Sequence, residues 1–256
     1  MKTLYLDCFS GISGNMFVGM LLNSGVPFAA YEEAMGKLGI SGYSLIHETV
    51  QKRGVQATYY NVVLEHHHDH EHTDHDHHHH HAHRGLPEIR DIIQHADISE
   101  TVKEKSLAVF QALGEAEAKV HGISIDEIHF HEVGAIDCIL DIVGTVWCLE
   151  YAGIEQIGVS PLHVGSGFVE CAHGRMPVPA PATAELLVGL PSYATDVKGE
   201  LVTPTGAALV KTLATYVGPR PKEFLDTTIA YGAGTKDLVI PNVLRGYIGE
   251  APAWHH

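Results

Sequence analysis

The sequence predicts an α/β or α+β fold: a mixed sheet with packed helices and a disordered histidine-rich loop. Strand-like and helix-like segments alternate along the chain, and 45% of its 256 residues are apolar, which suffices to fill a core. Residues 65–84 instead consist mainly of His, Asp and Glu, have no apolar period and cannot bury themselves. We therefore expect residues 1–64 to form an N-terminal α/β segment. Residues 85–256 should pack on it as the remainder of one compact domain.

The first 64 residues open like an α/β unit. A short apolar run that ends at Asp7 is followed by a loop of small residues, and the helix after this loop stops at Gly25. Gly39 marks the end of a second helix, because glycine readily adopts the left-handed conformation that terminates helices. Aromatic and β-branched residues then favour strands. The expected elements are a strand at 3–7, helices at 15–23 and 27–38, and strands at 43–50 and 55–64.

Helical patterns dominate after the histidine-rich loop. Ser99 is placed to cap an amphipathic helix that runs to about Val120, and the helix after it is apolar on almost every side, as a buried helix is. The last part of the chain mixes short strands with helices. The expected elements are helices at 86–96, 100–120, 134–151, 179–188 and 204–216, and strands at 157–159, 167–171, 226–231 and 243–248.

Charge and cysteine usage exclude several classes of protein. Acidic residues outnumber Lys plus Arg by 31 to 16, and a formal charge of −15 repels a polyphosphate backbone, so nucleic acid is not expected as a partner. Asp7 and Ser10 interrupt the first apolar run, and no stretch reaches the roughly 18 apolar residues of a membrane span. The four cysteines lack C-x-x-C spacing, which favours reduced thiols in the cytoplasm over a disulfide framework. A homo-oligomer is compatible with the sequence, which does not specify oligomeric state.

The histidine-rich loop is the most specific chemical signal in the chain. Imidazole suits nickel, copper and zinc far better than magnesium or calcium. A flexible run offers many interchangeable ligand sets, so we expect it to bind several ions as a store or relay, whereas catalysis needs a fixed geometry. An expression tag is the alternative, but tags lie at termini and lack interleaved acids. The candidate ligands are His66, His67, His68, His70, His72, His75, His77, His78, His79, His80, His81 and His83.

A second group of candidate metal ligands surrounds the start of the buried helix. His129 and His131 are two residues apart and share a face if the chain is extended, and Glu132 follows them. Asp137 and Asp141 are four residues apart, which stacks both carboxylates on one face of the helix. Acids on a buried helix need a cation or strong hydrogen-bond donors. A metal ion or a metal-bound phosphate would satisfy them, and pairing with arginines or backbone caps is the alternative.

Two helix starts are candidate anion sites. In the first loop, glycines let the backbone approach a ligand and the amides at the helix start point at an anion, although a tight turn alone explains the same residues. At the second, Thr203 is placed to cap a helix that starts with Pro204, and capping alone also explains this pattern. His173 and Arg175 add a proton carrier and an anion fork in a short turn. The candidate phosphate-binding residues are Asp7, Ser10, Gly11, Ser13, Gly14, Asn15, Arg175, Thr203 and Thr205.

Five segments carry a resemblance to a known family. They are residues 6–16, the histidine-rich loop, and residues 129–137, 173–179 and 203–206. Together they resemble the nickel insertion proteins of nickel-pincer cofactor biosynthesis, over almost the whole chain. The resemblance implies a cyclometallase, a metal-inserting lyase, that places Ni²⁺ into pyridinium-3,5-bisthiocarboxylic acid mononucleotide. It further implies that CTP is hydrolysed, with Mg²⁺ or Mn²⁺, and that the product serves lactate racemase and related enzymes.

The resemblance also implies partners for these residues. Family members continue into a C-terminal region to which binding of CTP and metal is assigned, and these 256 residues do not include it. We therefore expect this chain to supply the nickel-collecting loop and the surface that receives the mononucleotide. The missing region, or a separate polypeptide that carries it, is the expected partner for activity, together with apo lactate racemase.

The resulting hypothesis is a nickel relay. The His66–His83 loop captures Ni²⁺ and passes it to the cluster between His129 and Asp141, while the phosphate of the mononucleotide rests on the Gly11–Asn15 loop. Either His131 or His173 acts as the base that removes the ring proton where the nickel–carbon bond forms, because an imidazole titrates near working pH.

Two other functions remain open on the residues alone. A metal store or sensor without catalysis predicts that a chain without the loop binds no divalent ion tightly. A magnesium- or manganese-dependent enzyme acting on a phosphorylated small molecule would use Asp137 and Asp141 as ligands and the glycine loop as phosphate cradle, and it predicts turnover without nickel. Affinity order does not separate the metals, because copper outcompetes nickel at such sites.

Overall fold

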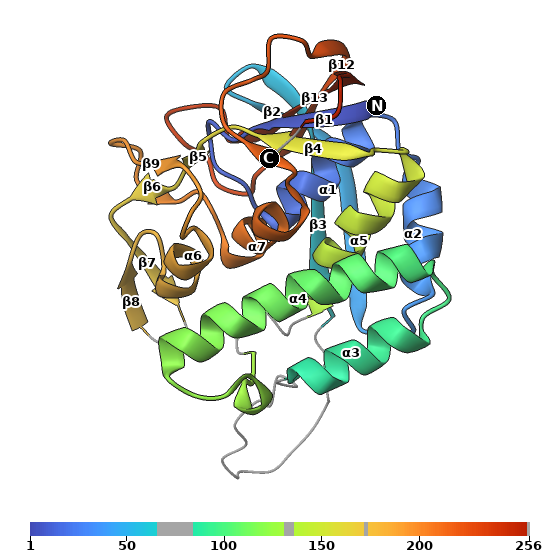
Figure 1. The fold of residues 1–256 in the computed structure, drawn as a ribbon, viewed down its shortest axis with the longest axis vertical. Helices are drawn as coiled ribbons and strands as arrows, with labels where there is room; N and C mark the ends of the chain where they lie inside the picture. Colours follow the sequence, from blue (N-terminus) through green and yellow to red (C-terminus); the bar gives the residue numbers. More distant parts are fainter. Residues whose placement is uncertain (66–83, 131–135, 172–173, 255–256) are drawn as a thin grey trace.

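The protein has a mixed α/β fold built on one seven-stranded sheet (Figure 1). The computed structural model describes residues 1–65, 84–130, 136–171 and 174–254. The strand order is β11-β4-β1-β13-β12-β3-β2, and the expected fold class is confirmed. The strands of this sheet are β1 (Lys2–Asp7), β2 (Tyr43–Lys52), β3 (Val55–Leu64), β4 (Gln156–Val159), β11 (Tyr216–Val217), β12 (Leu225–Ala233) and β13 (Val243–Glu250).

Helices and short strand pairs complete the described part of the chain. The helices are α1 (Gly14–Asn23), α2 (Phe28–Gly36), α3 (Leu86–His95), α4 (Glu100–His121), α5 (Ile136–Tyr151), α6 (Pro181–Leu186) and α7 (Pro204–Leu213), with a 3-10 turn at Ile125–Glu127. The short strands are β5 (Leu162–His163), β6 (Gly165–Ser166), β7 (Phe168–Cys171), β8 (Gly174–Pro177), β9 (Ser192–Tyr193) and β10 (Gly199–Glu200). None of the helices in the described ranges combines the length and the apolarity needed to cross a membrane.

Five strands of the sheet end at the same edge. β4 runs parallel to β1 and β11, β13 runs antiparallel to both β1 and β12, and β12 runs parallel to β3. The carboxyl ends of β1, β3, β4, β11 and β12 therefore lie together. Residues 8–13 follow β1, residues 234–242 follow β12, and Glu65 leads from β3 into the histidine-rich segment. In α/β sheets ligands bind outside the carboxyl ends of strands, so this edge is where a site is expected.

Local capping explains where the main helices begin and end. The Ser13 hydroxyl accepts a hydrogen bond from the Met16 amide at 3.4 Å, and the Ser99 hydroxyl accepts one from the Val102 amide at 3.1 Å. Gly122 ends α4 in the left-handed conformation, with φ 66°. These starts and stops agree with the sequence-based expectations for α1 and α4.

The expected helix at 204–216 is wrong in its last turn. α7 ends at Leu213, and Tyr216–Val217 forms the edge strand β11 instead. Thr215 makes the difference, because its amide donates to the Ile157 carbonyl at 2.8 Å and its hydroxyl accepts from the Ile157 amide at 3.1 Å. Pairing with β4 satisfies these backbone groups better than one more helical turn, which local pattern alone does not reveal.

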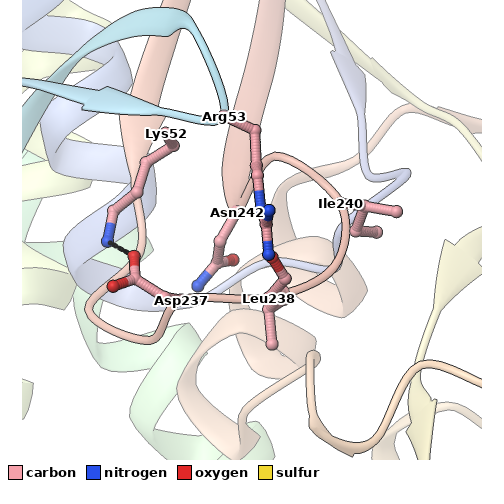
Figure 2. A pocket seen from close by; sticks show the side chains of 6 residues that line it. All are labelled: Lys52, Arg53, Asp237, Leu238, Ile240 and Asn242. Atoms are coloured by element: carbon pink, nitrogen blue, oxygen red, sulfur yellow. Dashed lines mark hydrogen bonds and ion pairs between the residues drawn. The ribbon is translucent and has the colours of Figure 1, made fainter.

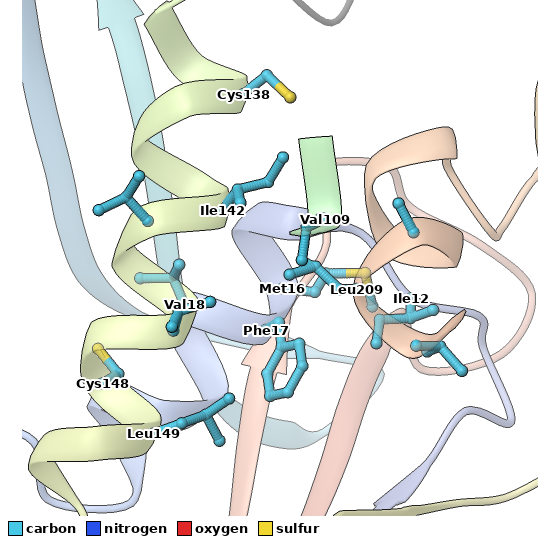
Figure 3. Packing of buried hydrophobic residues seen from close by; sticks show 14 of the residues in the cluster. Ile12, Met16, Phe17, Val18, Val109, Cys138, Ile142, Cys148, Leu149 and Leu209 are labelled. Atoms are coloured by element: carbon cyan, nitrogen blue, oxygen red, sulfur yellow. The ribbon is translucent and has the colours of Figure 1, made fainter. Parts of the chain in front are cut away.

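Helices cover one face of the sheet and build the main core. β1 shows the division, since Leu4 and Leu6 are fully buried against the helices while Tyr5 belongs to a smaller cluster on the opposite face. Figure 3 shows α1, α5 and α7 meeting through side chains such as Phe17 and Leu209. Because α1 precedes the histidine-rich segment and α5 and α7 follow it, one hydrophobic cluster unites both parts of the chain.

Candidate functional site

The loop between β1 and α1 is held against the start of α7. Gly11 adopts φ 77°, a conformation that favours glycine. The Ile12 amide then donates to the Leu201 carbonyl at 2.9 Å, and the Ile12 carbonyl accepts from the Thr203 amide at 3.1 Å. Thr203 caps α7 as Ser13 caps α1. The two helix starts that the sequence singled out therefore lie side by side at the carboxyl edge of the sheet.

Helix α5 lies against both helix starts, through Asp141 at the first and Cys138 at the second. A Cβ atom placed on Gly14 would lie 2.7 Å from the Cβ and Oδ2 atoms of Asp141 and 3.0 Å from Cγ2 of Thr205. The Cys138 thiol lies 3.3 Å from the Thr205 hydroxyl, one turn before Asp141 on α5. Glycine at position 14 is thus what allows this approach. The structure brings together residues predicted separately for phosphate and for metal.

The two acids of α5 each have a buried carboxylate oxygen without a hydrogen-bond partner among the described residues. Asp137 and Asp141 are half-buried side chains, yet the Oδ1 atom of each is closed to solvent and has no hydrogen-bond partner among the described residues. Burial raises the pKa of Asp141 well above its ordinary value, and the nearby charge of Asp137 adds to the rise. Burial also raises the pKa of Asp137, which amides in its own helical turn oppose. A cation at this place would relieve the cost of both charges.

A complete coordination sphere needs ligands beyond those described. Within the described ranges, no three His, Cys, Asp or Glu side chains form a group that could hold a metal ion. The candidates His131, Glu132 and His173, and the histidines from His66 to His83, lie outside the described residues. Two acids of α5 are therefore the part of the predicted metal cluster that the described structure brings together.

His129 connects the histidine-rich segment to this region. It is exposed, and it forms an antiparallel bridge with Gly85, while the Phe130 amide donates to the Arg84 carbonyl at 3.3 Å. Arg84 is the first described residue after the histidine-rich segment, and α5 begins at Ile136. The chain that leaves the histidine-rich segment is thus paired with the chain that leads into the acidic helix.

Three predicted phosphate-binding residues line one pocket. Ser13, Asn15 and Thr203 border a pocket of about 150 Å³. Lys236 and Asn242, from the loop after β12, line its other side. The sequence analysis missed Lys236 and Asn242. Their signal was their place in the loop between two predicted strands, since loops of α/β sheets often carry ligand-binding groups, but without the strand order nothing placed this loop beside α1.

The sequence of the chain matches a known protein family. The family model described as "Nickel insertion protein" matches residues 4–256. The chain belongs to the nickel insertion protein family. No solved structure matches this chain.

Relatives in this family are identical to the chain at 43% to 49% of the aligned residues. A pyridinium-3,5-bisthiocarboxylic acid mononucleotide nickel insertion protein of Desulfitobacterium hafniense (strain DSM 10664 / DCB-2) is 49% identical over 251 residues, which cover 98% of this chain and 59% of that protein. A putative nickel insertion protein of Geobacter metallireducens is 49% identical, covering 98% and 62%, and one of Dictyoglomus thermophilum is 43% identical, covering 98% and 61%. The chain spans about three-fifths of the length of these relatives.

Two predicted residues of this nickel insertion family member lie apart from the pocket. Asp7 accepts hydrogen bonds from Arg245 at 3.1 Å from Nε and 2.5 Å from Nη2, on the sheet face that the helices leave open. Arg175 lies on β8, and its Cζ atom is 4.6 Å from the centre of the Phe168 ring on β7. Ser10 is buried below the pocket, where its hydroxyl lies 3.5 Å from Oδ1 of Asn242. In this structure Asp7 and Arg175 therefore do not border the pocket with Ser13, Asn15 and Thr203.

Proposed function

We propose that this chain collects Ni²⁺ on its histidine-rich segment and delivers it to pyridinium-3,5-bisthiocarboxylic acid mononucleotide to form a nickel-pincer cofactor. Membership of the nickel insertion protein family supports nickel as cargo, and the name of the Desulfitobacterium hafniense relative supports the mononucleotide as the substrate. The observation that carries the proposal is the pairing of Gly85 with His129. It joins the end of the histidine-rich segment to the entry of the acidic helix.

Nickel moves from many weak ligands to a fixed site in this proposal. The segment from His66 to His83 offers imidazoles in many combinations, which favours capture over tight retention. Asp137 and Asp141 then supply two carboxylates whose negative charges are costly without a cation. His131 and Glu132, between His129 and α5, complete the ligand set in the proposal.

The chemical step needs a base and a held substrate. Ni²⁺ forms one bond to the pyridinium ring carbon and two to sulfur, the ring carbon loses its proton, and no change of oxidation state is required. His131 or His173 takes this proton in the proposal, because a neutral imidazole accepts a proton near neutral pH. The pocket beside Ser13, Asn15 and Thr203 supports a role in holding the nucleotide end of the substrate.

The remaining parts of the proposal concern the complete protein. CTP hydrolysis with Mg²⁺ or Mn²⁺, and use of the product by lactate racemase-type enzymes, are proposed for a polypeptide that also carries the region present in the longer relatives. The chain described here spans about three-fifths of such a polypeptide.

The test looks for the product directly. The purified chain is incubated with Ni²⁺, Mg²⁺, CTP and pyridinium-3,5-bisthiocarboxylic acid mononucleotide, and mass spectrometry detects the nickel adduct of the nucleotide. Adduct formation supports an insertion site within these residues. If the adduct forms only after the remaining region of a longer relative is added, the chain is the nickel-supplying part of the insertase. Continued failure with that region present contradicts the proposal and favours a metal store.

A further inference from the structure

The loop after β12 presents one lysine to the pocket at the two helix starts. Lys236 lines this pocket of about 150 Å³ together with Ser13, Asn15 and Thr203. Its side chain is exposed, and within the described part of the chain its ammonium group takes part in no hydrogen bond or ion pair.

The tip of the β2–β3 hairpin holds the backbone on both sides of Lys236. The Lys52 ammonium donates to Oδ1 of Asp237 at 2.9 Å and to the Thr235 carbonyl at 3.4 Å. Figure 2 shows the ion pair between Lys52 and Asp237. Nε of Arg53 donates to the Leu238 carbonyl at 2.8 Å. Arg53 makes this contact from φ 52°, a conformation that costs a side-chain-bearing residue strain. The hairpin therefore positions the loop rather than merely passing near it.

Asn242 ties the same loop to the loop that follows β1. It is 7% exposed, and its Nδ2 donates to the Lys236 carbonyl at 2.8 Å. Its Oδ1 lies 3.5 Å from the Ser10 hydroxyl, and its carbonyl accepts from the Gly234 amide at 2.9 Å. Asn242 thus holds the backbone of Lys236 and also contacts the loop that follows β1. The ammonium group of Lys236 remains free to bind a ligand in the pocket.

The chemistry of the pocket fits a phosphate monoester. The starts of α1 and α7 carry partial positive charge, and the Asn15 amide and the Thr203 hydroxyl are neutral donor groups. Lys236 adds three charged donors in a chain with a net charge of −15. Glu200 is the one acidic residue among the described residues that line this pocket. It also lines a second pocket of about 500 Å³ and therefore lies between the two.

We infer that Lys236 holds the phosphate group of the mononucleotide in this pocket, with Asn15 and Thr203 as neutral donors. The identity of the ligand rests on the proposed function, whereas the preference for a phosphate anion rests on the pocket itself. Lys236 is then a substrate-binding residue that distinguishes a mononucleotide from its riboside, because the riboside lacks the group that the lysine contacts.

Calorimetric titration of three variants of the full chain tests this inference. Pyridinium-3-carboxylic acid mononucleotide, its riboside and inorganic phosphate serve as probes. Lys236→Ala should bind the mononucleotide about 10- to 100-fold more weakly, the usual effect of losing a charged hydrogen bond, and should leave riboside binding unchanged. Lys236→Arg should retain most of the mononucleotide affinity. Lys222→Ala, which removes an exposed lysine that borders none of these pockets, should match the unmodified chain.

The outcomes separate this inference from the proposed function. Equal affinity of Lys236→Ala and the unmodified chain for the mononucleotide overturns the inference, as does an equal loss for mononucleotide and riboside. If the unmodified chain binds neither nucleotide, phosphate alone decides about the pocket, and the nickel-adduct assay decides about the proposed function. Phosphate binding that Lys236→Ala abolishes still supports the anion site, whereas absence of phosphate binding to the unmodified chain overturns it.

Discussion

Gly14 and Asp141 approach so closely that no side chain larger than hydrogen fits between them. A Cβ atom on Gly14 would lie 2.7 Å from both Cβ and Oδ2 of Asp141. The contact joins the first turn of α1 to the second turn of α5. It fixes the position of the Asp141 carboxylate relative to the loop that follows β1.

Gly14→Ala should destabilise the protein by about 1–3 kcal/mol, because the added methyl group forces Asp141 or the helix start to move. Gly36→Ala is the matched control, since Gly36 also lies in a helix but meets nothing within 4 Å. That substitution should stabilise by about 0.5–1 kcal/mol through lower entropy of the unfolded chain. Urea unfolding measures both, and similar effects of the two substitutions would contradict the close contact.

Asp141→Asn should stabilise the metal-free protein near neutral pH and weaken nickel binding. Burial, followed by the charge of Asp137, raises the folded-state pKa of Asp141. Stability contributed by such a group is present below the unfolded pKa of about 4 and is lost as the pH rises through the folded pKa. The variant should therefore lose this decline of stability with rising pH.

Thermal unfolding between pH 4 and pH 8 and nickel titration check the prediction for Asp141. Asp126→Asn, at an exposed aspartate in the 3-10 turn, is the control and should alter neither quantity. A lower unfolding temperature of Asp141→Asn at pH 7 without metal would show that the carboxylate has a stabilising partner. If the variant binds nickel as tightly as the unmodified chain, Asp141 is not part of the proposed nickel site.

Replacement of residues 66–83 by a Gly/Ser linker of equal length should lower the number of nickel ions bound per chain while sparing the fold. The reason is that the twelve histidines of this segment are the expected ligands, whereas the hydrophobic core is built from residues outside it. Equilibrium dialysis measures the stoichiometry and circular dichroism the fold. Unchanged stoichiometry in a folded variant would defeat the proposed role of the segment.

Asp7→Asn should lower stability by about 1 kcal/mol and leave mononucleotide binding unchanged. Asp7 pairs with Arg245 on the sheet face opposite the helices, and both side chains are partly shielded from solvent. Glu100→Gln, which removes a highly exposed partner of Lys103, should cost only a few tenths of a kcal/mol. A large loss of mononucleotide affinity in Asp7→Asn would show that Asp7 belongs to the phosphate-binding site, as the sequence pattern suggested.

Patterns over one or two turns were sufficient to predict much of the fold. The caps at Ser99 and Thr203 and the apolar surface of α5 all lie where the sequence placed them, and the expected ends of α1 and α4 are right to within one residue. The end of α7 was wrong because Thr215 pairs with Ile157 of another strand. A local signal does not contain that information.

The candidate site was likewise predicted only in part. Burial of Asp137 and Asp141 followed from the apolar residues around them on one helix, and the structure leaves both Oδ1 atoms without a partner. Lys236 was missed because the sequence does not show which strands are neighbours, and only the strand order places its loop beside the start of α1. Asp7 was grouped with the phosphate loop by adjacency, whereas its partner Arg245 lies 238 residues away.

By itself, the sequence determined the class of fold, the histidine-rich segment and the residue types available for nickel, because composition, periodicity and capping are properties of neighbouring residues. Only the tertiary structure decided which of these residues meet. The order of strands places β13 between β1 and β12, and this order sets the loops at residues 8–13 and 234–242 around one pocket. Such contacts depend on which distant strands exchange backbone hydrogen bonds, and their free energy is shared over the whole sheet rather than encoded at any single position.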